Sequence, residues 1–165
     1  MPGHGRALLD THKALPVVGA SDAELATDLA PFAALRDAPM GMTCHVVFSS
    51  WDAELPATLS PTVIQSIIRE RIGFNGLLMT DDLDMDALAG DVPSRAARAI
   101  AAGCDIALNC WAKMDDMVGI ANALPAMSVE ARARLDGAME RVRDVRNGAD
   151  FAALIERRDA LMAAA

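Results

Sequence analysis

The most distinctive chemistry of the chain lies at residues 76–84, which read Gly-Leu-Leu-Met-Thr-Asp-Asp-Leu-Asp. The apolar run from Leu77 to Met79 does not alternate with polar residues, which is typical of a strand buried on both faces of a parallel sheet. Ligands of such folds bind outside the carboxyl ends of the strands. Asp81, which follows this run and Thr80, is therefore a catalytic candidate. The alternative is that Asp81 or Asp82 caps the next helix.

A second candidate pair lies near the beginning of the sequence, where Asp10 and His12 follow a Gly-rich stretch. A carboxylate two residues from an imidazole can hold the ring in one tautomer and raise its basicity. Together with Asp81, this imidazole would supply the acid/base that a carboxylate nucleophile needs. The alternative is a solvated polar loop, because loops are exposed by default.

Two further histidines are candidates of a different kind. His4 lies between two glycines, and His45 lies near the end of an expected strand. The alternatives are a turn residue for His4 and a hydrogen-bonded wall residue for His45. An acidic cluster follows the central strand: Asp81, Asp82, Asp84 and Asp86. It lacks the Gly and the distal Glu of a calcium loop, so no metal site is predicted.

Composition limits the class of protein. The chain has 165 residues, enough for one domain with a core, and a net charge of −8 with a pI near 4.7. This charge argues against a nucleic-acid or anionic-membrane partner. No apolar stretch approaches the roughly 20 residues of a membrane span, and the N-terminus lacks a secretory signal. The three cysteines have no metal-ligand spacing. A soluble, cytoplasmic protein is predicted.

The elements that would position these residues alternate between helix and strand. The first half of the pattern predicts a loop over 1–20, a helix that begins with a capping box at Ser21, a strand over 40–48 and a helix over 61–72. Strands are then expected over 76–80 and 105–109, with a helix from Pro93 to Gly103 between them. Further helices are expected near 115–123, 128–146 and 150–163. Such alternation predicts an α/β fold of right-handed parallel β/α units. A complete (β/α)8 barrel needs about 250 residues. About three parallel strands therefore indicate a small open sheet or part of a barrel.

The central stretch also carries a family signature. Residues 67–71, Ile-Ile-Arg-Glu-Arg, are followed after four residues by Gly-Leu-Leu-Met-Thr-Asp at 76–81, with Asp84 three further on. This pattern resembles the active-site signature of family 3 glycoside hydrolases. The resemblance implies a (β/α)8 barrel domain in which Asp81 is the nucleophile.

The beginning of the chain narrows the resemblance to one branch. Pro-Gly-His-Gly at 2–5, followed by Asp10-Thr11-His12-Lys13, is similar to the mobile Asp-x-His loop region of the bacterial β-N-acetylhexosaminidases. The resemblance implies that His12 is the general acid/base and that Asp10 orients it. It also makes His4 and His45 candidates for binding substrate. The similarity runs over residues 2–112.

The resemblance implies a retaining β-N-acetylhexosaminidase that removes terminal β-linked N-acetylglucosamine from muropeptides during cell-wall recycling, without a metal or organic cofactor. Residues 1–165 are expected to be the C-terminal portion of the barrel domain, from the loop after strand five to strand eight. Family members carry a sugar-binding Lys-His pair just before the Pro-Gly-His-Gly segment, a position that residues 1–165 do not include. The activity of this chain is therefore expected to be weak. Such an enzyme would be active only as a longer chain or when paired with its missing half. The alternatives are a non-catalytic half-barrel that self-associates as a structural or interaction module, and a different β/α enzyme that uses the acidic cluster for a cation.

Overall fold

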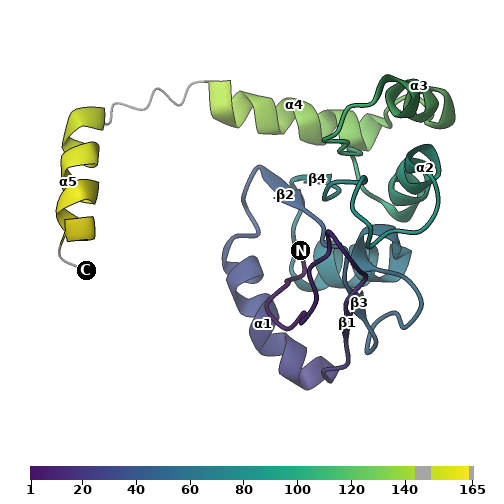
Figure 1. The fold of residues 1–165 in the computed structure, drawn as a ribbon, viewed down its shortest axis with the longest axis horizontal. Helices are drawn as coiled ribbons and strands as arrows, with labels where there is room; N and C mark the ends of the chain where they lie inside the picture. The colour runs from purple at the N-terminus through teal and green to yellow at the C-terminus, as the bar shows by residue number, and fades with distance from the viewer. Residues whose placement is uncertain (144–149, 164–165) are drawn as a thin grey trace.

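The computed structural model describes residues 1–143 and 150–163. Figure 1 shows short strands surrounded by helices. The elements in chain order are β1 (Val17–Val18), α1 (Asp22–Ala34), β2 (Met40–Met42), β3 (Val47–Phe48), η1 (Ala57–Leu59), η2 (Val63–Arg71), β4 (Leu77–Met79), α2 (Val92–Ala102), α3 (Met114–Ala123), α4 (Val129–Arg143) and α5 (Phe151–Ala163).

The strands are parallel, as the alternation of helix and strand predicts. β2 pairs with β4 in the register Met40 to Leu77 and Met42 to Met79. Met79 forms a further parallel bridge with Ile106, so the predicted strand over 105–109 is present as a single bridge. β1, inside the stretch predicted as a loop, pairs in parallel with β3. Consecutive parallel strands joined by helices are the repeating unit of α/β barrels.

The strand predicted over 40–48 is interrupted. β2 ends at Met42 and β3 begins at Val47, and the residues between them are buried. Two of these, Thr43 and His45, are polar, and each hydrogen-bonds to the Thr58 hydroxyl, with 2.8 Å between the bonded atoms. A buried polar side chain must find a partner. The inward-pointing side chains of Thr43 and His45 therefore lie in a break between β2 and β3, where the sequence pattern predicted one regular strand.

Local signals fix where the helices begin and end. Ser21 forms the predicted capping box with Glu24 at the start of α1, and Asp91 caps α2. Gly103 ends α2 with a φ of 115°, a left-handed conformation that suits glycine. Pro31 does not interrupt α1, which continues to Ala34. η2 occupies most of the predicted helix over 61–72 but has π geometry.

The core lies between the strands and their covering helices. Its side chains are mostly aliphatic and include Val46, Ile64, Ile68, Phe74 and Leu78. At the amino end of β4 the core encloses one ion pair: Arg69 donates to Asp105 at 2.9 Å, and both side chains are nearly buried. The same Asp105 carboxylate accepts the backbone N–H of Leu78 at 2.9 Å.

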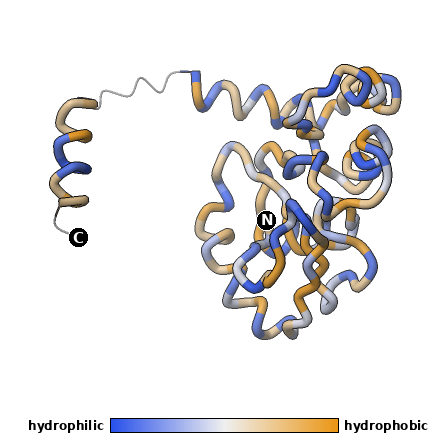
Figure 2. Tube along the Cα trace, in the orientation of Figure 1, coloured by the Kyte–Doolittle hydropathy of each residue, from blue (hydrophilic) through white to orange (hydrophobic). Residues whose placement is uncertain are grey.

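The sequence places Leu135, Met139, Val142 and Val145 on one face of the helix expected over 128–146. Leu135 is half-buried in α4, whereas Met139 is 47% and Val142 45% exposed. The buried residues of α4 are two small ones, Ala131 and Ala138. Small side chains allow the helix to pack closely, and Figure 2 shows further apolar residues along α3 and α4. Val145, expected on the same face, lies outside the described residues. Within the described ranges, no helix is long and apolar enough to cross a membrane.

Candidate active site

Asp81 lies at the carboxyl end of β4, where the sequence placed it. The preceding Thr80 is fully buried and fixes this position. Its N–H donates to the Ile106 carbonyl at 3.0 Å, and its hydroxyl oxygen accepts the Leu108 N–H at 2.8 Å. Thr80 thus joins the end of β4 to the next strand segment. The hydroxyl residue before the acid is structural.

The Asp81 carboxylate is half-buried and has one free oxygen. Oδ1 accepts the N–H of Asp82 at 2.8 Å, and Oδ2 has no hydrogen-bond partner among the residues that the structure describes. α2 begins eleven residues later, at Val92, and is capped by Asp91. Asp81 therefore does not cap that helix, and its free oxygen is available for chemistry.

Asp82 and Asp84 tie the loop after β4 to the loop after Ile106. Asp82 Oδ1 accepts the backbone N–H of Cys110 at 3.0 Å. Asp84 Oδ2 accepts the Asn109 side-chain amide at 2.8 Å and the Trp111 N–H at 3.0 Å. The acidic cluster thus binds N–H groups. In the described part of the chain, no group of three or more His, Cys, Asp or Glu side chains could hold a metal ion.

The backbone of the β4–α2 loop has two further side-chain partners. Arg95 donates to the carbonyls of Leu83, at 2.7 Å, and Met85, at 3.2 Å. The Nε2 atom of His45 lies 2.9 Å from the carbonyl oxygen of Asp82. The residues that follow Asp81 are therefore held from both sides.

Asp10 and His12 form the predicted pair. Oδ1 of Asp10 lies 2.9 Å from Nδ1 of His12 and also accepts the His12 backbone N–H at 3.0 Å. These two hydrogen bonds, the backbone one first, lower the pKa of the Asp10 carboxyl from its ordinary value. Because a carboxylate only accepts, Nδ1 carries the hydrogen, and Nε2 is left free to give or take a proton. Both side chains are exposed.

Thr11, which the sequence did not mark, connects this pair to the β4–α2 loop. Thr11 is buried, and its carbonyl accepts the N–H of Ala87 at 3.2 Å. The Asp10–His12 loop is thus attached to the loop that follows Asp81. A hydrogen bond between two backbone groups depends on no side-chain type, so no sequence signal could have found it.

The two remaining histidines differ in their surroundings. His45 is fully buried, and both ring nitrogens are hydrogen-bonded within the protein. Burial lowers the pKa of its imidazole. This structure therefore supports no direct contact between His45 and a sugar. His4 is exposed and lines a separate cavity of about 390 Å³ with Phe32 and Trp51. Substrate binding by His4 stays a prediction.

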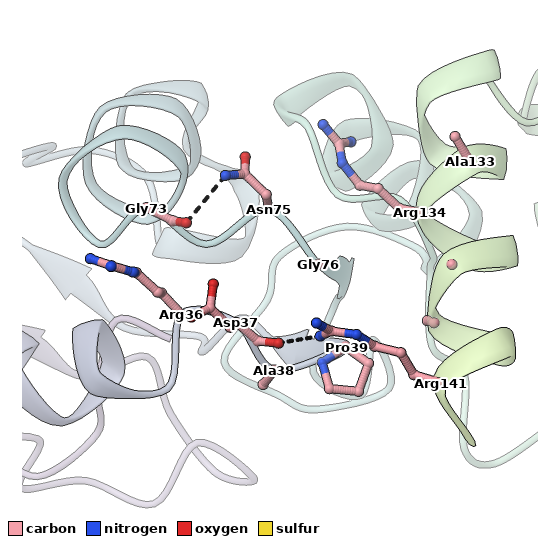
Figure 3. A pocket seen from close by; sticks show the side chains of 12 residues that line it. Arg36, Asp37, Ala38, Pro39, Gly73, Asn75, Gly76, Ala133, Arg134 and Arg141 are labelled. Atoms are coloured by element: carbon pink, nitrogen blue, oxygen red, sulfur yellow. Dashed lines mark hydrogen bonds between the residues drawn. The ribbon is translucent and has the colours of Figure 1, made fainter. Parts of the chain in front are cut away.

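A cavity of about 420 Å³ lies at the opposite end of the strands (Figure 3). Its walls are the turns before β2 and β4 and one side of α4, and Arg141 donates to the Asp37 carbonyl across it. Ala38 and Pro39 precede β2, and Gly76 precedes β4, so the cavity is at the amino ends of the strands. In α/β barrels this face contributes to stability, whereas the carboxyl face carries the reaction.

Comparison with known proteins decides the family. Residues 1–145 match the model of the glycosyl hydrolase family 3 N terminal domain. The chain belongs to glycoside hydrolase family 3. The fold prediction is confirmed: parallel strands with flanking helices match part of the barrel domain of this family. The label of a C-terminal half needs correction, because the matching model is that of the family's N terminal domain.

The similar proteins of this family are much longer than the chain. A beta-hexosaminidase of Bordetella pertussis is 39% identical over 141 residues, which are 81% of this chain and 40% of that protein. A beta-hexosaminidase of Methylococcus capsulatus is 45% identical over 114 residues, 66% of this chain and 34% of that protein. The chain thus spans about two fifths or less of these two relatives.

Solved structures agree in fold. A family 3 beta-N-acetylglucosaminidase from Paenibacillus sp. FPU-7 is 33% identical with a TM-score of 0.77, over 90% of this chain and 31% of that chain. NagZ from Neisseria gonorrhoeae, in complex with N-trifluoroacetyl-D-glucosamine, is 34% identical with a TM-score of 0.68, over 83% of this chain and 41% of that chain. The chain is therefore related to the beta-hexosaminidases of family 3.

Proposed function

We propose that the chain carries the catalytic residues of a retaining β-N-acetylhexosaminidase, with Asp81 as nucleophile, His12 as general acid/base and Asp10 as its partner. The observation that carries the proposal is the backbone hydrogen bond between Thr11 and Ala87, which attaches the Asp10–His12 loop to the loop after Asp81. A nucleophile and an acid/base must lie at one carboxyl-end face to act on one sugar.

In the first step, Oδ2 of Asp81 forms a bond to the anomeric carbon, and the glycosidic C–O bond breaks. Nε2–H of His12 gives its proton to the departing oxygen. In the second step, water attacks the anomeric carbon, His12 takes a proton from that water, and the bond to Asp81 breaks. Asp10 accepts the Nδ1–H of His12 throughout and stabilises the imidazolium that acts as the acid.

The proposed substrate is a terminal β-linked N-acetylglucosamine on a muropeptide, handled in the cytoplasm during cell-wall recycling. Support comes from the beta-hexosaminidases to which the chain is similar and from the N-acetylglucosamine analogue bound to the Neisseria protein. No metal or organic cofactor takes part in the proposed reaction.

The chain is proposed to form part of the barrel of this domain. Support comes from the short span relative to the relatives and from the three parallel segments β2, β4 and Ile106. The remaining β/α units would supply most sugar contacts, and positioning contributes about 7–11 kcal/mol to enzymatic rate enhancement. We therefore expect weak turnover by the chain alone and stronger turnover when it is paired with, or extended by, those units.

Covalent trapping of the nucleophile tests this function. A 5-fluoro-N-acetylglucosaminyl fluoride, which accumulates the glycosyl-enzyme, is incubated with the chain alone and with a version that also carries the remaining β/α units of the barrel. Mass spectrometry of the digest should place the label on Asp81. The matched control is Asp86→Asn, because Asp86 is exposed and has no hydrogen bond among the described residues. Label on another residue, or full turnover by Asp81→Asn, would refute the assignment.

A non-catalytic interaction module is the second candidate. The exposed apolar residues of α3 favour it: Met114, Met117 and Val118. Such a patch suits contact with another protein surface. Light scattering that finds a discrete oligomer, with no trapping of Asp81 in either version, would favour this candidate over the hydrolase.

A further inference from the structure

His45 is the one histidine of the three whose ring lies wholly inside the protein. Its position between β2 and β3 places the ring beneath the loop that follows Asp81. Nε2 lies 2.9 Å from the Asp82 carbonyl oxygen, and Nδ1 lies 2.8 Å from the Thr58 hydroxyl oxygen. Both ring nitrogens therefore have a partner.

The two partners determine where the hydrogen of the ring lies. A carbonyl oxygen can only accept, so Nε2 of His45 carries a hydrogen and donates it to Asp82. In a neutral ring Nδ1 then accepts. The Thr58 hydroxyl has one hydrogen and two acceptors, Nδ1 at 2.8 Å and the Cys44 carbonyl oxygen at 3.1 Å, and the shorter contact favours donation to Nδ1. The Thr58 oxygen in turn lies 2.8 Å from the Thr43 hydroxyl oxygen, which can supply a hydrogen to it. The chain of donors ends at the Asp82 carbonyl.

Asp82 connects this buried network to the nucleophile. His45 holds the carbonyl of Asp82, and the N–H of the same residue donates to Oδ1 of Asp81 at 2.8 Å. The N–H and the carbonyl of Asp82 belong to the two peptide units that meet at its Cα, so a shift of this backbone that releases the carbonyl from His45 can also displace the N–H from Oδ1. The orientation of the free oxygen, Oδ2, is thus coupled to the imidazole.

We propose that His45 is a positioning residue that holds the Asp81 carboxylate in its reactive orientation through the backbone of Asp82. The catalytic part of this inference rests on the proposed function, whereas the structural coupling does not. His45 acts as a neutral Nε2–H donor, and it contacts no substrate. The charged groups that face it are the carboxylates of Asp81 and Asp82 and the guanidinium of Arg95.

Nuclear magnetic resonance tests the coupling on the intact chain, whether or not that chain has activity. Nitrogen-15 spectra of the three histidine rings should show His45 as the neutral Nε2–H tautomer. The Asp82 amide proton should shift as the Asp81 carboxyl titrates, because the two groups share a hydrogen bond. An Nδ1–H tautomer of His45, or an Asp82 amide that ignores Asp81, would overturn the proposal.

Two substitutions of His45 distinguish the loss of its N–H donor from the loss of its side-chain volume. In His45→Gln the side-chain amide can still reach the Asp82 carbonyl, and the response of the Asp82 amide to Asp81 should survive. In His45→Leu the donor is lost, and the response should be smaller while the remaining amide spectrum stays that of a folded protein. If His45→Leu does not fold, Thr58→Val removes only the hydroxyl beside Nδ1, and the Nε2–H tautomer and the amide response should both survive, because the Asp82 carbonyl alone fixes the ring hydrogen. Loss of the Nε2–H tautomer in Thr58→Val, or an unchanged amide response in folded His45→Leu, contradicts the inference.

Kinetics in the extended version distinguish a failure of this inference from a failure of the proposed function. His45→Leu should lower kcat by about 100-fold with little change in KM, because a small displacement of a reacting group has that effect. His45→Gln should recover most of the rate. Equal losses in both variants would contradict the positioning role while leaving Asp81 as nucleophile. Absence of Asp81 labelling in the unmodified extended protein would refute the proposed function and leave the spectroscopic result standing.

Discussion

Replacement of Asp105 by asparagine is expected to destabilise the protein strongly. The Asp105 carboxylate is nearly buried and accepts three hydrogen bonds: from Arg69 at 2.9 Å, from Arg134 at 2.8 Å and from the Leu78 N–H at 2.9 Å. Asparagine has the same shape but no charge, and only one of its two side-chain groups accepts. The Arg69 guanidinium, 9% exposed, would then lack its counter-charge.

The expected loss can be estimated from this geometry. Breaking a buried pair by removing one partner costs about 3–5 kcal/mol, because the other charge stays buried without compensation. The Arg134 bond adds little, since that side chain is 30% exposed and water can replace its partner. We therefore expect Asp105→Asn to lower the free energy of unfolding by about 3–5 kcal/mol, a large fraction of the stability of a typical domain.

Urea unfolding followed by circular dichroism measures this loss. The matched control is Asp136→Asn, which removes an exposed pair with Arg132 at 3.0 Å on α4. That pair should contribute no more than about 0.5 kcal/mol. A loss below about 1 kcal/mol for Asp105→Asn, comparable to the control, would refute the idea that this ion pair fixes the amino end of β4.

Three further predictions concern single groups. The Asp10 carboxyl should titrate below its ordinary pKa by carbon-13 NMR, and its pKa should rise in His12→Ala; because the folded pKa is lowered, the stabilising contact is present above the unfolded pKa and is lost as the pH falls through the folded one. Iodoacetamide at pH 8 should alkylate exposed Cys110 in the native chain but not Cys44 or Cys104, since burial raises the pKa of Cys104 to about 12 and also raises that of Cys44. Urea should expose all three thiols to the reagent. Alkylation of Cys104 in the native chain would contradict its buried position. Gly76→Ala should lower stability by about 1–3 kcal/mol in urea unfolding, because its Cβ would lie 2.5 Å from the Ala38 carbonyl oxygen, whereas Gly19→Ala, with nothing within 4 Å, is the control.

The sequence predicts well those features that one short stretch determines. The capping box at Ser21 and the glycine stop at Gly103 depend on neighbouring residues, and both are present. The apolar run before Asp81 identifies a buried parallel strand for the same reason. These features are local, and their residue types are the physical cause of the structure.

Features that depend on distant partners were not predictable in the same way. The strand expected over 40–48 is interrupted because Thr43 and His45 find Thr58, and no spacing rule links these residues. α4 buries Ala131 and Ala138 instead of its larger apolar residues, because the space that it meets decides which face fits. The anchoring of Thr11 to Ala87 joins two backbone groups, which carry no signal in the residue type.

The partners of the acidic residues after β4 separate structural roles from chemical ones. Asp82 and Asp84 each accept a backbone N–H from the loop at 109–111. Each of them therefore joins the loop after β4 to that loop. Among the described residues Asp81 makes no hydrogen bond to another element; its one bond is to the N–H of the next residue. Asp81→Asn should therefore leave both loops in place, since an amide oxygen still accepts that N–H. A loss of labelling in this variant would then report on chemistry, whereas the same loss in Asp82→Asn or Asp84→Asn would not separate chemistry from loop structure.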